Sequence, residues 1–315
     1  MSVDIDKTGG GPQDTPPPAA RPEAIKAIPV RHYGRYLSAF IAVALLALIV
    51  YAFGQGKINW GTIPEFFFDE RIVTGALKTL LLTVLAMVIG IVGGIVLAVM
   101  RLSKNPVTSS ISWFYIWFFR GTPVLVQLFI WFNLGLVFEY INLGPIYKDY
   151  WSSFMTPFLT ALLGFGLNEA AYMAEICRAG LQSVDEGQTE ASHALGMSHG
   201  KTLRRVIIPQ AMRVIVPPTG NEVINMLKTT SLVSMVQFVE LFRAAQDIGQ
   251  QSGSPVEMFF LAAAWYLIMT SILSVGQYYI ERYYARGTSR QLSATPWQKV
   301  RGTLFSLGRP NGGMA

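Results

Sequence analysis

The sequence has little of what a soluble domain or a disulfide-stabilised protein contains. Only 14% of its 315 residues are charged, and it has a single cysteine, Cys177. One cysteine has no partner within the chain, which excludes a disulfide framework, and charged residues make up about a quarter of an average soluble domain. Apolar residues instead reach 51%, and 12% are aromatic. This composition is typical of a membrane protein.

Catalytic and metal-binding signatures are also missing. No Asp or Cys joins His32, His193 and His199 at ligand spacing, so no metal site is expected. The segment from Gly196 to Thr202 reads G-x-x-x-G-K-T, which is one residue shorter than a phosphate-binding loop and follows a helical segment instead of a strand. No serine elbow or comparable motif is present. We therefore expect the chain not to be an enzyme.

Long apolar runs are what the sequence does contain. Tyr36–Phe53 and Thr79–Met100 are uncharged runs of 18 and 22 residues, each long enough to cross about 30 Å of hydrocarbon at about 1.5 Å per residue. The second run carries Gly90 and Gly94 one turn apart, a spacing that lets another helix approach closely. Residues 1–34 are polar and rich in Pro and Gly, without the apolar run of a secretory signal, and predict a disordered tail.

The apolar stretch 107–138 is too long for one upright span, and Arg120 interrupts it. We predict a helix that begins with Thr122 as N-cap and Pro123 as first helical residue, and that ends near Phe138. Three further helices are expected at about 156–180, at 209–238 with a bend at two adjacent prolines, and at 258–280. The sequence thus predicts an all-α polytopic membrane bundle of about six transmembrane helices.

Six spans place both termini on one side of the membrane. If that side is the cytoplasm, 19 of the 25 Lys and Arg residues flank the cytoplasmic ends of the spans, as the positive-inside rule requires. The excess of Lys and Arg over Asp and Glu is therefore explained without a nucleic-acid partner. A multi-pass protein of the cell membrane with both termini in the cytoplasm follows, and the connection 182–209 then faces the cytoplasm.

This connection is built like a short helix followed by a break. Ala191, Ala194 and Leu195 fall at i, i+3 and i+4 spacing on one face, and Gly196 can end the helix in a left-handed conformation. Such a helix could dock into a partner's groove or lie against its own membrane domain. Periodicity alone leaves both possibilities open.

The spacing of the segment 190–209 is more specific. It begins with E-A-S at Glu190. Three residues separate this triplet from Gly196, and nine more separate Gly196 from the final V-I-I-P, which ends at Pro209. The segment resembles the EAA loop of ABC importer permeases, whose pattern is E-A-A, three residues, G, nine residues, I-x-L-P. Only Ser192, Val206 and Ile208 depart from it. The resemblance implies an ATPase-coupling loop made by Glu190, Ala191, Ser192, Ala194, Leu195, Gly196 and Pro209.

Other segments resemble the branch of this family that imports polar amino acids: TLLLTVLAMVIG, FFRGTPVLVQLF, AYMAEICRAG, SVDEGQTEA and NEVINMLKTTSL. They imply a five-helix permease domain at 72–284 that contains the coupling loop 182–209. Residues 35–71 then form an extra N-terminal helix with an external loop, and 285–315 form a cytoplasmic tail.

The function that the resemblance implies is that of the permease subunit of an ABC importer for polar amino acids. ATP and Mg would be bound by separate ATPase subunits, with no cofactor in this chain. Further implied partners are a second permease subunit, identical or different, an extracytoplasmic solute-binding protein and the amino acid itself. An ion-coupled secondary transporter is the alternative, but it leaves the EAA-like loop unexplained and would show an internal repeat that the sequence lacks.

Charged groups inside membrane spans are costly and therefore indicate function. Glu175 can pair with Arg178 one turn later, and Glu222 can close a capping box with Thr219. Glu169 has no such local explanation. We predict a substrate path that contains Glu169, Tyr172, Lys228, Thr230 and Ser231, whose donors and acceptors suit a zwitterionic amino acid. An internal salt bridge between Glu169 and Lys228 is the structural alternative.

Overall fold

The computed structural model describes residues 33–142, 144 and 148–284 and divides the chain into two units, 1–57 and 58–315. The expected C-terminal tail and nearly all of the expected N-terminal tail lie outside the described residues. The described part of the first unit is α1 (Tyr33–Gln55), which is apolar along its length and exposes each side chain that the structure describes. A helix that is apolar on all sides suits a lipid environment.

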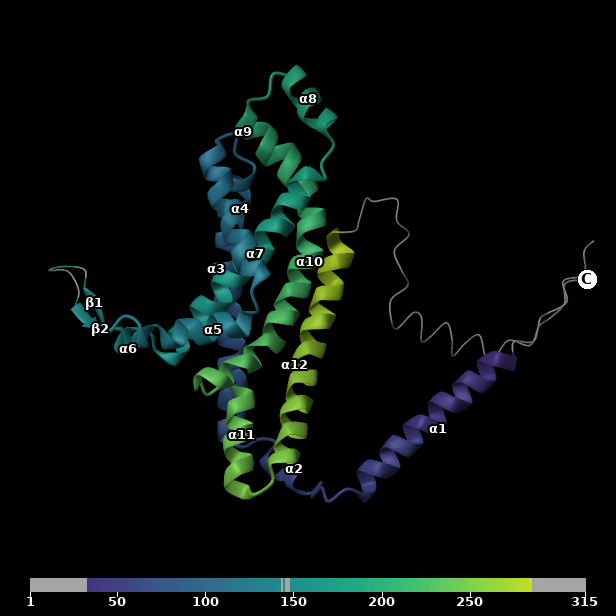
Figure 1. Cartoon of the computed structure of the whole chain (residues 1–315). Coiled ribbons are helices and arrows are strands. Elements are labelled where there is room, and N and C mark those ends of the chain that lie inside the picture. Colours follow the sequence, from purple (N-terminus) through teal and green to yellow (C-terminus); the bar gives the residue numbers. More distant parts are fainter. Residues whose placement is uncertain (1–32, 143, 145–147, 285–315) are drawn as a thin grey trace, which may run out of the picture. The chain divides into compact units, whose positions relative to one another are not determined.

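The second unit is a bundle of helices (Figure 1). Its elements are α2 (Thr62–Phe66), α3 (Glu70–Arg101), α4 (Pro106–Gly121), α5 (Val124–Asn133), η1 (Leu134–Leu136), β1 (Tyr140–Asn142), β2 (Lys148–Tyr150), α6 (Trp151–Phe154), α7 (Pro157–Gln182), α8 (Glu186–Ala194), α9 (His199–Thr202), η2 (Leu203–Ile207), α10 (Ile208–Thr229), η3 (Thr230–Val236), α11 (Leu241–Ser252) and α12 (Pro255–Tyr284). The two strands form an antiparallel hairpin. Within this unit α8 and α9 lie at one end, and α2 and α11 at the other (Figure 1).

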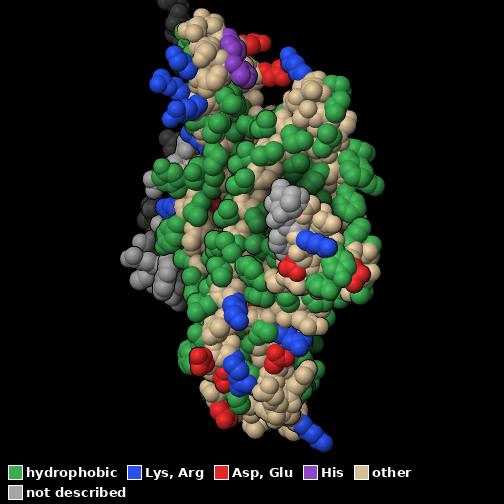
Figure 2. All heavy atoms as spheres, turned by 90° about the vertical axis from the view of Figure 1, so that its left-hand side faces the viewer, with side chains coloured by type: hydrophobic (Ala, Val, Ile, Leu, Met, Phe, Trp, Pro, Cys, Tyr) green, Lys and Arg blue, Asp and Glu red, His purple; other side chains and the backbone are tan. Residues whose placement is uncertain are grey.

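Three helices of the described part are long and apolar enough to span a membrane: Tyr36–Gln55 of α1, α3 and α12. The pair α4 and α5–η1, which is bent by 101°, counts as a fourth if it forms one broken span. α7 and α10 have 26 and 22 residues, enough to cross by length, but carry polar side chains that lower their hydropathy. Charged side chains lie mostly toward the two ends of the face shown in Figure 2, with hydrophobic ones between.

α3 and α7 pack closely against each other. A Cβ atom on Gly94 would lie 2.4 Å from Cβ of Met173, and one on Gly90 would lie 2.4 Å from Cγ of Glu169. Both distances are far below van der Waals contact, so the two glycines allow the backbones to approach. The predicted packing role of this glycine pair is confirmed.

Three local predictions are wrong. Thr122 does not cap the helix that follows, because α5 begins at Val124 and the Thr122 hydroxyl donates to the Phe118 carbonyl of α4. That helix also ends at Asn133, before a short 3₁₀ turn, well short of Phe138. The capping box at Glu222 is absent, because α10 is continuous and the Thr219 hydroxyl donates to Ile215 O one turn back.

Glu240 stabilises the end of the bundle that carries α11 through hydrogen bonds. Its carboxylate is completely buried and accepts hydrogen bonds from the Phe242 and Arg243 amides, from the Tyr266 hydroxyl at 2.7 Å and from the Thr79 hydroxyl at 3.2 Å. It thus caps α11 and ties it to α3 and α12 in one group.

We expect Glu240→Ala to lower the free energy of unfolding by about 2–4 kcal/mol, because it removes a cap and leaves buried donors without acceptors. Asp69→Ala is the matched control: Asp69 caps α3 by accepting from the Arg71 amide, but this site is exposed to solvent, and the loss should be about 1 kcal/mol or less. Thermal unfolding in detergent measures both. Equal destabilisation by the two substitutions would contradict the role given to Glu240.

Candidate functional site

A polar cavity of about 580 Å³ lies where the α4–α5 junction meets α7 and α10. Three segments far apart in the sequence supply its walls: residues 120–124 from the junction, Phe165 to Tyr172 from α7, and Glu222 to Thr229 from α10. The cavity combines two carboxylates and one guanidinium with amide and hydroxyl groups. A small zwitterion needs such a mixture of donors and acceptors.

The α7 wall carries Asn168, Glu169 and Tyr172, which lie on one side of the helix. Glu169 is only 4% exposed, and its Oε1 atom has no hydrogen-bond partner among the described residues. Its side-chain stem lies against Gly90 of α3, where any other residue would occupy the same space. A buried carboxylate oxygen without a protein donor is free to accept from a ligand.

The α10 wall is also made by one face of its helix. Glu222, Asn225 and Thr229 follow one another at i, i+3 and i+7 and therefore share one face of the helix, which lines the cavity. Sequence reasoning assigned Glu222 to a cap and did not select Asn225 or Thr229. Their spacing along the helix could have identified them, because it places them on the same face as Glu222.

The α4–α5 junction closes the cavity with extended backbone. Thr122 and Pro123 adopt extended conformations between the two helices. The side-chain amide nitrogen of Gln127 donates to Phe119 O at 3.0 Å and to the hydroxyl of Thr122 at 2.7 Å. Asn168 also donates to Phe119 O, at 2.9 Å, so the junction is held against α7.

Arg120 supplies the positive charge of the cavity. Its guanidinium lies over the ring of Tyr172 at 5.2 Å from the ring centre, an arrangement that favours a cation. A neighbouring cavity of about 590 Å³ shares Arg120 and Tyr172 and adds Arg101 and Arg178. Arg178 is paired with Glu175, as the sequence predicted. Positive charge therefore dominates beyond Arg120, on the side away from Glu169.

The structure brings together only part of the predicted substrate path. Glu169 and Tyr172 line the cavity, whereas Lys228, Thr230 and Ser231 do not. Lys228 is exposed, and no ion pair joins it to Glu169 within the described residues. The hydroxyls of Thr230 and Ser231 donate to carbonyls of their own helical turns. Thr229, which shares a helix face with Glu222 and Asn225, lines the cavity instead of these three predicted residues.

The loop between α7 and α10 has the predicted helix and break. α8 begins after Asp185, which caps it by accepting from the Gly187 amide at 2.8 Å. It ends at Ala194, and the chain turns at Gly196, whose φ of +73° is left-handed and whose amide donates to His193 O. Pro209 follows as the second residue of α10, where a missing N–H is tolerated.

One side of α8 is exposed. Ser192 is 4% exposed and faces inward, but Glu190, Ala191, Ala194 and Leu195 are exposed, the last at 82%. An exposed leucine flanked by alanines on a short helix is a surface that another protein could bury. Of the two possibilities left open by periodicity, the outward-facing apolar side favours docking to a partner.

The family described as "Binding-protein-dependent transport system inner membrane component" matches residues 90–286. The chain belongs to this family. It is thus a multi-pass membrane permease of the ABC transporter class and not the catalytic component. Nothing in the comparisons supports an ion-coupled secondary transporter.

Relatives of the permease include the arginine transport system permease protein ArgU of Corynebacterium glutamicum, which is 52% identical over 277 residues, covering 87% of this chain and 88% of that protein. The nopaline transport system permease protein NocM of Agrobacterium fabrum is 40% identical over 204 residues, covering 65% and 83%. A solved amino acid ABC transporter with histidines has a TM-score of 0.63 at 35% identity, covering 72% of this permease and all of that chain. The fold is also that of the MetNI methionine ABC transporter, with a TM-score of 0.55 at 19% identity over 69% of this chain and 98% of that chain.

Proposed function

We propose that the chain is the permease subunit of an ABC importer for polar amino acids and that the cavity between the α4–α5 junction, α7 and α10 binds the amino acid during passage. The observation that carries the proposal is the buried, unpartnered Oε1 atom of Glu169 in a cavity that also contains Arg120. An amino acid can offer its carboxylate to the guanidinium and its ammonium group to Glu169.

The charge balance favours a cationic amino acid. Glu169 and Glu222 line the cavity with one guanidinium, that of Arg120, so a ligand with two positive groups and one carboxylate leaves no charge unpaired. The relative named as an arginine permease agrees with this preference. A dicarboxylic amino acid would place a second carboxylate near the two acids, which costs several kcal/mol through like-charge repulsion.

ATP hydrolysis takes place on partner subunits in this proposal. The exposed side of α8, from Glu190 to Leu195, docks into a cleft of an ABC ATPase that binds ATP and Mg, while Gly196 sets the angle to α9 and α10. Closure of the ATPases then moves α8 as a rigid body and opens the cavity to each side in turn. Both termini and α8 lie in the cytoplasm, consistent with the distribution of Lys and Arg along the sequence.

The complete assembly contains two permease subunits, because one bundle of this size does not enclose a path on all sides. The second subunit is either another copy or a related chain. An extracytoplasmic binding protein delivers the amino acid at the end of the bundle that carries α2 and α11, opposite α8 and α9.

Competition for uptake tests the proposed function. The importer is reconstituted in vesicles with its ATPase and binding protein, and uptake of labelled arginine is measured against excess lysine, histidine, glutamine or glutamate. We expect ATP-dependent uptake, with lysine competing about tenfold more strongly than glutamate. Uptake that needs an ion gradient instead of ATP would contradict the function, and equal competition by glutamate would contradict the charge preference.

A further inference from the structure

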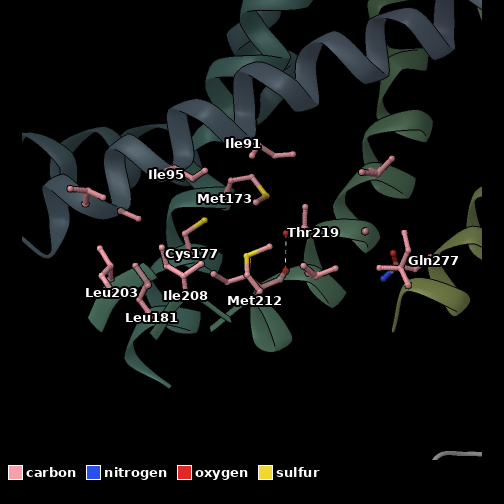
Figure 3. A pocket seen from close by; sticks show the side chains of 17 residues that line it. Ile91, Ile95, Met173, Cys177, Leu181, Leu203, Ile208, Met212, Thr219 and Gln277 are labelled. Carbon is pink, nitrogen blue, oxygen red and sulfur yellow. Dashed lines mark hydrogen bonds between the residues drawn. The ribbon is translucent and has the colours of Figure 1, made fainter. Parts of the chain in front are cut away.

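A second cavity, of about 480 Å³, lies on another side of α7 and α10, between these helices and α3 and α12. Figure 3 shows Ile91 and Ile95 of α3, Met173 of α7 and Met212 of α10 around this space. Its lining is apolar except for Thr219 and Gln277, whose donor groups are bound to protein carbonyl and carboxylate oxygens. Such a lining offers nothing to a polar ligand.

This cavity is a groove that opens on the outer surface of the helices. Ile95, Val99 and Ile280 line it and are also 49%, 61% and 44% exposed. α3 and α12, which carry these residues, are candidate membrane spans. The open side therefore lies along apolar helices of membrane-spanning length, where acyl chains of phospholipids can reach it.

Where α3 and α7 form its walls, the length of the groove fits one leaflet. On α3 it extends from Ile91 to Val99, and on α7 from Met173 to Leu181; eight residues of helix correspond to about 12 Å. The α10 wall continues further, from Ile208 to Val223. Half of a bilayer's hydrocarbon core is about 15 Å thick. An acyl chain that lies along the groove thus has its headgroup near the end where Leu181 and Leu203 lie.

Positive charge collects at that end. Arg204 and Arg205 directly follow Leu203 on the π-helical segment η2; both are exposed, and neither makes an ion pair among the residues that the structure describes. Arg282 lies two residues beyond Ile280 on α12 and donates a hydrogen bond to the hydroxyl of Tyr278, at 3.4 Å. Long arginine side chains at the end of a span reach the phosphate level of the membrane.

We propose that this groove binds an acyl chain of an anionic phospholipid from the surrounding bilayer and that Arg204 and Arg205 hold its phosphate. The apolar lining selects the chain, and the two unpaired guanidinium groups select an anionic headgroup, with a preference of about fivefold for each arginine. Because η2 joins the α8–α9 loop to α10, the bound lipid would stiffen the connection between this loop and the bundle.

Native mass spectrometry of the purified permease tests the proposal, with phosphatidylglycerol and phosphatidylethanolamine supplied in equal amounts. Two variants each remove one part of the site. The double substitution Arg204→Gln with Arg205→Gln removes the contacts to the phosphate, and the single substitution Ile95→Trp fills the groove. Their matched controls are Lys104→Gln with Lys201→Gln, exposed cations at the same end, and Val92→Trp, an exposed position on α3 outside the groove.

We expect retained phosphatidylglycerol to fall about 25-fold in the double arginine variant, about fivefold for each arginine, and about tenfold in Ile95→Trp, and to stay unchanged in both controls. Equal retention of the two lipids by the unaltered chain would overturn the headgroup assignment. Unchanged retention in Ile95→Trp would overturn the groove as the site. Loss of subunit assembly in Ile95→Trp, but not in Val92→Trp, would show that another protein chain occupies the groove and would also overturn the proposal.

Discussion

Replacing Glu169 by glutamine is expected to lower amino acid uptake by about a hundredfold or more, because removing one partner of a buried charge pair costs about 3–5 kcal/mol. Glutamine keeps almost the same volume, so the close contact with Gly90 of α3 is preserved. The substitution removes the charge that faces the ligand's ammonium group and leaves the helix packing intact.

Glu65→Gln is the control for this prediction, because Glu65 is an exposed carboxylate on α2, outside the cavity. It should transport at the rate of the unaltered chain. Thermal unfolding of Glu169→Gln should also match that of the unaltered chain, which separates a lost ligand contact from a folding defect. Normal uptake by Glu169→Gln would remove Glu169 from the substrate path and, with it, the main support for this cavity as the amino acid site.

A β-branched residue at Gly196 is expected to separate ATP hydrolysis from uptake. Gly196 has a left-handed φ of +73°, and apart from its two chain neighbours no described residue has an atom within 4 Å of where its Cβ would be. Gly196→Val is therefore opposed by backbone strain alone, at a cost of about 1–3 kcal/mol. Relief of that strain would change the direction in which α8 enters α9, and the surface around Glu190 would meet the ATPase at the wrong angle.

Gly200→Val provides the matched control, since Gly200 has equally open surroundings but lies within α9 without a positive φ. Uptake per ATP hydrolysed should fall about tenfold or more in Gly196→Val and by less than twofold in Gly200→Val. Glu190→Lys, which reverses an exposed charge on α8 without touching the turn, should also uncouple the two activities. If both glycine variants behaved alike, the left-handed turn would have no role in coupling.

Apolar runs and glycine positions were the most predictable features. α1, α3 and α12 follow from stretches whose composition allows only a membrane span, and the turn at Gly196 follows from a residue type that tolerates positive φ. The N-terminal end of α3 extends beyond the uncharged run, because Asp69 caps the helix and α3 begins at Glu70, nine residues before Thr79. Hydrocarbon thickness limits the apolar part of a helix and not its full length.

Features that depend on distant contacts were not predictable from local patterns. Glu240 resembles any surface acid in the sequence, yet it bonds Thr79, 161 positions away. The prediction of a capping box at Glu222 was wrong for a similar reason. Gln277 of α12 donates to Pro217 O at 2.8 Å, and this distant contact supports α10 at the point where the local sequence predicts a break. Single-sequence reasoning also placed Lys228 instead of Thr229 in the cavity, since it weighed charge above helical angle.

The two prolines inside α10 affect its mechanics. Pro217 and Pro218 have no amide hydrogens, so the carbonyls of Arg213 and Val214 lose their usual helical donors. The bending stiffness of α10 is therefore lowest along this stretch, between the loop end at Ile208 and the cavity face that begins at Glu222. A displacement of the loop reaches the cavity as a change of angle at this point. The hydrogen bond that Gln277 of α12 donates to Pro217 O opposes this change.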